Sequence, residues 1–337
     1  MTASSLPPTN PLQRLRRRLA PLTLLVFAAP AAAQTSRVQQ IPASNVFCVE
    51  VRDDTIVAGA ETAVFVSTDG GTSWRRSAQL APAVTSIQAV RLHRGRLYAG
   101  TFGQGVFVSD DLGATWSPFN QGLTGGPLDS QRFVSSFEAF GDNLYVGTFG
   151  AGVYARRLSS GGWTHFGEVL EPEQASNVNT IAIGGGRILA AGGSNGNVFW
   201  RERGDADWTP SGLGPNDRSL PGVQAHSLFR TSNRWVVGTS AGIFLSASGQ
   251  APWTLSSLGV VPLRWSALTM RGSTLVAAFD LPTAAVIEVS PDEGQSWEFV
   301  ETQPGVFVFA LAAHGDELFA ARADGLWRSL AFAHRGL

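Results

Sequence analysis

Hydrophobic and polar residues alternate in short runs along most of the chain, and turn-forming residues separate these runs. A representative stretch gives four such runs, at residues 86–92, 96–101, 105–109 and 115–119. Runs of this length divided by glycine-rich turns are typical of β-strands. Because no window shows a sustained period of 3.6 residues, we expect little helix.

The strand pattern repeats. The segment GTFGQGVF at 100–107 returns as GTFGAGVY at 147–154, and a third version occupies 238–244. A tryptophan follows each strand group at matching intervals of about 45 residues. The six tryptophans are Trp74, Trp116, Trp163, Trp208, Trp253 and Trp297. A seventh unit starts near Phe307 and stops before a tryptophan of its own.

Four antiparallel strands in each repeat match one blade of a β-propeller. We therefore predict an all-β fold, a seven-bladed β-propeller of four-stranded antiparallel blades. Residues 36–42 precede the first expected inner strand, at 45–51, and belong to no blade of their own. We expect them to pair with the incomplete seventh blade and close the ring; the alternative is that the tail at 330–337 does so.

Three turns share the pattern S-x-D-x-G-x-x-W, at residues 67–74, 109–116 and 290–297. These segments resemble Asp-box (BNR) repeats, which occur in sialidases, in other glycoside hydrolases and in many non-enzymatic propellers. The segments at 156–163, 201–208 and 246–253 keep the tryptophan and lose the aspartate and glycine. We expect Ser and Asp to bond nearby amides, the glycine to adopt a positive φ, and the tryptophan to pack between strands or blades. The turn is then a folding device.

Residues 1–33 have the features of a signal peptide. Four arginines between 14 and 18 precede an apolar run at 19–33, and Ala31, Ala32 and Ala33 offer a cleavage site before Gln34. The run is short for a membrane span and contains Pro21. We expect a secreted or periplasmic protein with its propeller at 34–337 and no stable membrane insertion; the alternative is an uncleaved anchor.

Composition excludes several function classes. Charged residues are 15% of the chain and the formal net charge is −1, which gives no reason to expect a nucleic-acid partner. All 25 basic residues are arginine, so Schiff-base lysines and P-loop lysines are absent. The single cysteine, Cys48, excludes an internal disulfide, and the five histidines show no metal spacing. We expect no metal and no cofactor.

The resemblance to sialidases implies catalytic residues that this chain largely lacks. The family carries an Arg-Ile-Pro segment near its start, where this chain has Gln40-Ile41-Pro42. The family nucleophile is a tyrosine backed by a glutamate, and the three tyrosines here, Tyr98, Tyr145 and Tyr154, fall at packing positions in strands. Arg132, Arg264 and Arg322 could converge on one face, but solvated or locally paired arginines are the simpler expectation.

Other catalytic signals are isolated. A glycoside hydrolase needs two carboxyl groups about 5–10 Å apart, and Glu171, Glu173 and Asp280 lie in expected loops without an identifiable partner. The segment 192–196 matches G-x-S-x-G, yet it falls in a loop between strands, whereas the nucleophile elbow joins a strand to a helix. We predict no catalytic residue.

The favoured interpretation is a monomeric, non-catalytic propeller that binds a protein or carbohydrate partner through its loop-rich face. Aromatic and arginine residues are the usual anchors of such a face. Two alternatives remain: a divergent sialidase-like or other glycoside hydrolase, and a propeller like the assembly factors of photosystem II. The predicted binding residues are Phe102, Phe149, Arg132, His226, Arg264 and Trp265.

Overall fold

The computed structural model describes residues 35–81, 84–123, 127–167, 177–192, 197–213, 224–258, 266–281, 284–304 and 307–329. The chain divides into two compact units, Met1–Ala32 and Ala33–Leu337, and every described residue belongs to the second unit. Within these ranges, no helix has the length and apolar character needed to cross a membrane.

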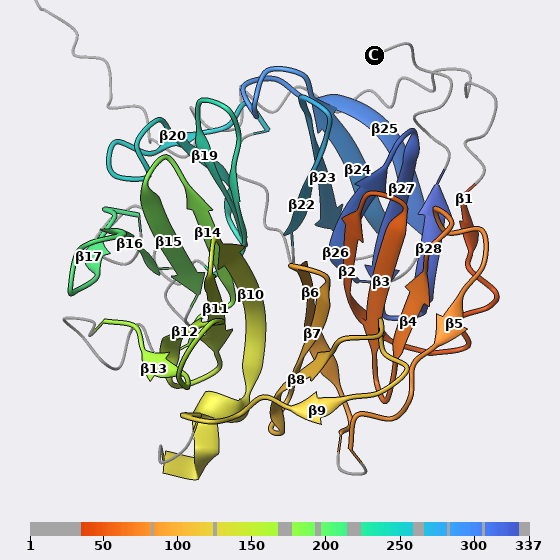
Figure 1. Cartoon of the computed structure of the whole chain (residues 1–337). Coiled ribbons are helices and arrows are strands. Elements are labelled where there is room, and N and C mark those ends of the chain that lie inside the picture. The colour runs from red at the N-terminus through yellow and green to blue at the C-terminus, as the bar shows by residue number, and fades with distance from the viewer. Residues whose placement is uncertain are drawn as a thin grey trace, which may run out of the picture. The chain divides into compact units, whose positions relative to one another are not determined.

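Strands account for more than half of the described residues. Over the described residues they form seven four-stranded antiparallel sheets, numbered here as blades 1 to 7 in chain order (Figure 1). The strands of the first four blades are β2 (Val46–Arg52), β3 (Thr55–Ala60), β4 (Val64–Ser67) and β5 (Arg75–Arg76); β6 (Ile87–His93), β7 (Arg96–Thr101), β8 (Gly105–Ser109) and β9 (Ser117–Pro118); β10 (Val134–Phe140), β11 (Asn143–Thr148), β12 (Gly152–Arg157) and β13 (Thr164–His165); and β14 (Thr180–Gly184), β15 (Arg187–Gly192), β16 (Asn197–Glu202) and β17 (Thr209–Pro210).

Blades 5 to 7 repeat this arrangement, except that blade 7 takes its outer strand from the start of the chain. Their strands are β18 (Ala225–Arg230), β19 (Trp235–Thr239), β20 (Gly242–Ser246) and β21 (Thr254–Leu255); β22 (Ser266–Arg271), β23 (Thr274–Asp280), β24 (Ala284–Ser290) and β25 (Glu298–Pro304); and β26 (Val308–His314), β27 (Glu317–Arg322), β28 (Gly325–Ser329) and β1 (Thr35–Arg37). A short 3-10 helix, η1 (Pro127–Arg132), precedes blade 3.

The blades form a closed ring. The first strand of each blade contacts the first strand of the next, and β26 of blade 7 contacts β2 of blade 1. The predicted seven-bladed propeller is therefore confirmed, with strand bounds within one residue for three of the four strands examined in blade 2. The fourth is shorter than expected: β9 keeps only Ser117 and Pro118 of the 115–119 run, and Thr115 and Trp116 belong to the preceding turn.

The N-terminal strand closes blade 7, as predicted. Strand β1 pairs antiparallel with β28, and the amide of Val38 donates to the carbonyl of Leu326 at 2.8 Å. Figure 1 shows this orange-red strand beside the blue β28. The hydroxyls of Thr35 and Ser329 each donate to the Glu301 carboxylate of blade 6, both at 2.9 Å. The alternative closing segment, 330–337, lies outside the described residues.

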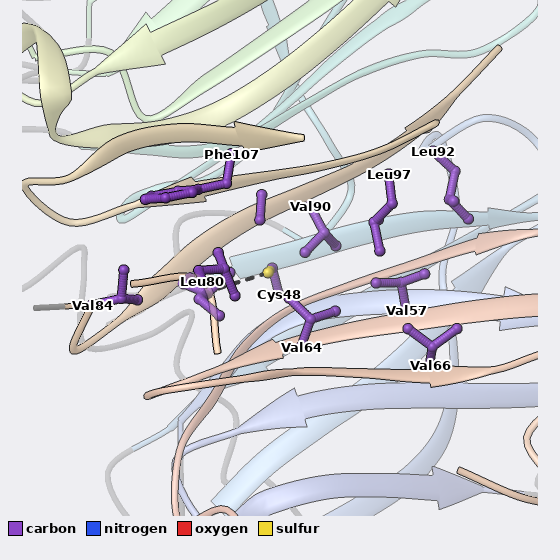
Figure 2. Close-up of a cluster of buried hydrophobic side chains, with 12 residues drawn as sticks. Cys48, Val57, Val64, Val66, Leu80, Val84, Val90, Leu92, Leu97 and Phe107 are labelled. Carbon is purple, nitrogen blue, oxygen red and sulfur yellow. Dashed lines mark hydrogen bonds between the residues drawn. The ribbon is translucent and has the colours of Figure 1, made fainter. Parts of the chain in front are cut away.

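Buried side chains collect between neighbouring blades. The cluster between blades 1 and 2 contains Cys48, Val57, Leu97 and Phe107 (Figure 2). The Cys48 thiol donates a weak hydrogen bond to the Ile87 carbonyl, 3.6 Å away, and burial raises its pKa to about 12. Cys48 is thus a small buried group, as its place in an alternating run predicts.

The S-x-D-x-G-x-x-W turns are stabilised by local hydrogen bonds. In the second of them, the amide of Gly113 donates to the Ser109 hydroxyl at 2.7 Å. Asp111 accepts from the Thr115 hydroxyl and amide and from the Ser109 hydroxyl, and these bonds lower its pKa to about 2. Gly113 has a φ of 89°, which a side chain resists. The other two turns repeat this pattern.

Where the turn pattern is degenerate, the tryptophan still joins two blades. The indole of Trp163 donates to the Phe119 carbonyl of blade 2 at 2.6 Å, and that of Trp208 donates to the Phe166 carbonyl of blade 3 at 2.7 Å. Both tryptophans are buried. The predicted packing between blades is confirmed, and it survives loss of the aspartate because the indole makes its own inter-blade bond.

Candidate functional site

Bulges aim one side chain from each of five inner strands at the start of the central channel. In β2 the pairing with β3 shifts between Val46 and Cys48, so Phe47 is left out of the ladder. A bulge leaves its extra residue unpaired and redirects its side chain. The same shift occurs at the equivalent point of four other inner strands. The five bulge residues are Phe47, Gln88, Ser135, His226 and Phe309.

These residues line a cavity of about 480 Å³ to which the first strands of all seven blades contribute. We call this end of the channel, where the inner strands begin, the channel mouth. The loops between blades and the turns between second and third strands lie at this end, because adjacent strands are antiparallel. The S-x-D-x-G-x-x-W turns lie at the opposite end for the same reason.

The lining of the cavity is uncharged. The described residues that line it include no Asp, Glu or Arg, and its ionisable groups are His226 and the Cys48 thiol. His226 is 8% exposed, and burial lowers its pKa to about 4. Its imidazole is therefore neutral at pH 7, and so is the thiol. Aromatic rings form part of the wall, with Phe47 and Phe309 packed at 5.6 Å between centroids.

Three phenylalanines form a continuous surface beside the cavity, which we call the phenylalanine ledge: Phe102, Phe133 and Phe149. The rings of Phe102 and Phe133 meet edge to face at 4.7 Å, and Phe102 lies 6.0 Å from Phe149. Phe102 is 49% exposed, whereas Phe149 also lines the cavity. The ledge therefore leads from the outer surface of blades 2 and 3 into the channel mouth.

The repeated G-T-F-G-x-G segment explains why two of these rings lie at this end. In blade 2 the Thr101 hydroxyl donates to the Gly105 carbonyl at 2.8 Å and accepts from the Gln104 amide at 3.1 Å. This bonding fixes a tight turn, and Gly103 completes it with a φ of 99°. Phe102 follows the threonine directly, so its ring stands on the turn. The equivalent turn in blade 3 has the same two bonds.

Four of the six predicted binding residues lie at the channel mouth. Phe102 and Phe149 belong to the ledge, and the Arg132 carbonyl accepts from the Gly103 amide at 3.1 Å. His226 lines the same cavity as Phe149. Arg264 and Trp265 lie outside the described residues, as do Glu171, Glu173 and residues 193–196.

Three aromatic residues of this site are not among those predicted from the sequence. Phe47 and Phe309 occupy the same place in their strands as His226, so aligning the strand starts of the repeats would have found both. Phe133 precedes β10 at the end of the irregular segment that contains η1. Its position has no signal in the repeat pattern, because it depends on how that segment folds back over the blade 2 turn.

The charged groups at this end are held by local partners. Arg322 is buried and pairs with Asp324 at 3.0 Å, and its guanidinium lies 4.4 Å from the ring of Trp327. The Arg132 Nε donates to the Leu123 carbonyl at 3.3 Å. The simpler expectation for these two arginines is thus confirmed.

The expectation for Asp280 was wrong. Asp280 is the last residue of β23 rather than part of an enlarged loop, and it is 3% exposed. Both carboxylate oxygens accept from the Val308 amide at 3.2 Å, and burial raises the pKa of this carboxyl to about 6. The misassignment arose because β23 and β24 extend further than their counterparts in the other blades.

Two glutamates flank one arginine further along the inner strands. Arg91 of β6 lies 2.9 Å from Glu138 of β10 and 3.8 Å from Glu50 of β2. Glu50 also accepts from the Leu92 amide at 2.8 Å. Burial raises the pKa of Glu50 to about 7, against the attraction of Arg91, and burial also raises the pKa of Glu138. This cluster connects three blades and lies outside the cavity lining.

The three tyrosines lie in the second and third strands of their blades. Tyr98 and Tyr145 are buried in β7 and β11, and Tyr154 lies in β12, as their repeat positions predict. Over the residues that the structure describes, no group of three or more His, Cys, Asp or Glu side chains is placed to hold a metal ion.

Comparison with known proteins places the chain by its fold. No protein-family model matches the sequence, and no curated protein matches it either. YCF48 bound to a D1 peptide superposes with a TM-score of 0.63 at 17% identity, over 88% of this chain and 96% of that one. YCF48 from Cyanidioschyzon merolae gives 0.65 at 14% identity, over 88% and 98%. The shared property is the fold.

A further match is the extracellular domain of a putative hybrid two-component system from B. thetaiotaomicron. Its TM-score is 0.69 at 17% identity, and the match covers 88% of this chain. This chain spans 40% of the length of that domain. A computationally designed protein, Ika8, superposes at 0.59 with 14% identity, over 84% of this chain and 82% of its own. At identities this low, the superpositions support the propeller architecture and carry no residue-level inference.

Proposed function

We propose that this chain is an exported, non-catalytic propeller that binds a protein partner at the channel mouth. The observation that carries this proposal is the continuity between the phenylalanine ledge and the uncharged cavity, which share Phe149. Exposed aromatic side chains beside a concave site are the usual anchors of a protein interface. The resemblance of the turns to Asp-box repeats and the signal-like residues 1–33 complete the proposal.

The lining favours binding over hydrolysis. Glycoside hydrolysis uses a pair of carboxyl groups across a cleft, whereas the described lining of the cavity offers none. The partly buried pair Glu50 and Glu138 shares one arginine outside that lining. A hydrolase is therefore not our proposal.

One comparison bears on the partner and another on the localisation. YCF48, which shares this fold, has been solved with a bound D1 peptide, and the match covers nearly all of that chain. We take this as support for a peptide segment rather than a glycan as the ligand of the channel mouth. The matched domain of the two-component system is extracellular, which is consistent with the secreted or periplasmic localisation that we propose for a monomeric chain.

The proposal can be tested by placing a photo-crosslinking amino acid, p-benzoylphenylalanine, at Phe102 or at Phe140. Both rings are about half exposed, at 49% and 46%, and they lie at opposite ends of the channel. We expect irradiation in the culture fluid or envelope extract of the source organism to give a discrete adduct from position 102 and none from position 140.

The nature of the adduct decides between partner classes. A protein adduct from position 102 alone supports the proposal. Adducts from both positions in similar yield, or from position 140 alone, contradict the channel mouth as the site. An adduct from position 102 that consists of carbohydrate contradicts a protein partner and supports glycan binding at the same site.

A further inference from the structure

The chemistry of the channel mouth points to a specific kind of anchor, and this inference rests on the proposed function. We propose that the partner inserts one uncharged aromatic or aliphatic side chain into the cavity, while the adjoining backbone crosses the phenylalanine ledge. Two features of the site carry the inference: its aromatic wall and its lack of charge.

The wall of the cavity suits an apolar side chain. Phe47 and Phe309 come from adjacent blades 1 and 7, and Phe149 comes from blade 3, so aromatic carbon is presented from separate parts of the ring. Leu228 and Leu311 add aliphatic surface from blades 5 and 7. An apolar group that enters such a site exchanges water for carbon contacts, which is the main source of affinity in concave sites.

The cavity has no fixed charge to receive an ionised anchor. A carboxylate or guanidinium placed there would lose its hydration without gaining an ion pair from the described lining. The same environment already acts on His226, whose pKa burial lowers to about 4. A neutral partner side chain avoids this desolvation cost.

Three polar side chains at the mouth bond to groups beside them, whereas the Ser136 and Ser227 hydroxyls, which also line the cavity, have no hydrogen-bond partner among the described residues. Asn179 donates through Nδ2 to the Ala225 carbonyl of blade 5 at 2.8 Å, and the Ser135 hydroxyl donates to the carbonyl of Val178, next to blade 4. Gln88 donates to the Ser86 hydroxyl beside it. These contacts hold the strand starts together.

The test begins with a phage-displayed library of random heptapeptides selected on the intact chain without residues 1–33. We expect the enriched peptides to share one uncharged aromatic or aliphatic position. A synthetic peptide from this set is then measured by fluorescence anisotropy, beside a version with aspartate at the shared position. We expect the aspartate version to bind at least tenfold more weakly.

A charge introduced into the mouth gives the reciprocal test. Gln88→Glu keeps the side-chain length and adds a carboxylate to the lining, and we expect it to weaken the selected peptide at least tenfold. Gln295→Glu makes the same change on an exposed turn at the opposite end of the channel, and we expect an effect below twofold. If Gln88→Glu does not fold, Phe102→Ala replaces it, because that ring is half exposed.

The outcomes separate the two proposals. If the selected peptides share a charged anchor but bind Phe102→Ala more weakly than wild type, the neutral anchor is overturned and the channel mouth remains the binding site. Peptides that bind equally well to wild type, Gln88→Glu and Phe102→Ala overturn the proposed function as well. An empty selection, or binding confined to a glycan array, overturns the peptide anchor.

Discussion

Closure of the ring by the N-terminal segment predicts that one buried residue between β1 and β2 controls global stability. Ile41 is 0% exposed and belongs to the cluster between blades 7 and 1, with Phe319 and Leu326. Ile41→Ala removes three carbons, each worth roughly 0.8 kcal/mol when buried, and leaves a cavity. We expect a loss of about 3 kcal/mol in the free energy of unfolding.

The matched control for this variant is Gln39→Ala, because Gln39 is two residues away and its side chain is exposed. We expect it to change the free energy of unfolding by less than about 0.5 kcal/mol. Urea unfolding followed by tryptophan fluorescence measures both variants, and amide exchange of Val38 reports its bond to Leu326. Equal urea midpoints for Ile41→Ala and wild type, together with an unprotected Val38 amide, would refute closure by this segment.

Two further predictions concern a tight turn and a partly buried carboxyl group. In urea unfolding, Gly71→Ala should lower the free energy of unfolding by at least about 1 kcal/mol more than the control Gly95→Ala. Both glycines have a positive φ, but only at Gly71 would the new Cβ meet the Phe319 ring, 2.6 Å away. Equal losses in the two variants would show that the clash is relieved. Glu50 has a pKa raised to about 7, so its contribution to stability is fully present below pH 4.5 and is lost as the pH rises through 7. Glu50→Gln should therefore flatten the fall in stability between pH 5 and pH 8, and a variant that keeps the wild-type slope would exclude this carboxyl as its source.

The repeat made most of the fold predictable from sequence. Tryptophans such as Trp116 and Trp163 mark equivalent points of successive blades, and their spacing gave both the number of blades and the place where the last one stops. The turn at 109–116 was predictable because its bonds, from Ser109, Asp111 and Gly113, are local in the chain. The closing strand followed from simple counting, because one blade lacked a strand and one segment lacked a blade.

The candidate site was less predictable, because it depends on contacts between blades. The sequence marks Phe102 and Phe149 through a repeated turn, but the bulges that turn Phe47 and Phe309 toward the channel depend on how each inner strand pairs with its neighbour. The place of Asp280 was also not predictable from the sequence. Its loop-like setting in the sequence concealed a strand end buried against the Val308 amide of the next blade.

The most direct test of the account is amide hydrogen exchange of the chain with and without its crosslinked partner or selected peptide. The account predicts slower exchange on binding in the two ledge turns, at 101–105 and 148–152, and at the strand start around His226. It predicts no change in the turns at 67–74 and 290–297 at the opposite end. Protection confined to those opposite turns, with exchange at the ledge unaltered, would contradict binding at the channel mouth.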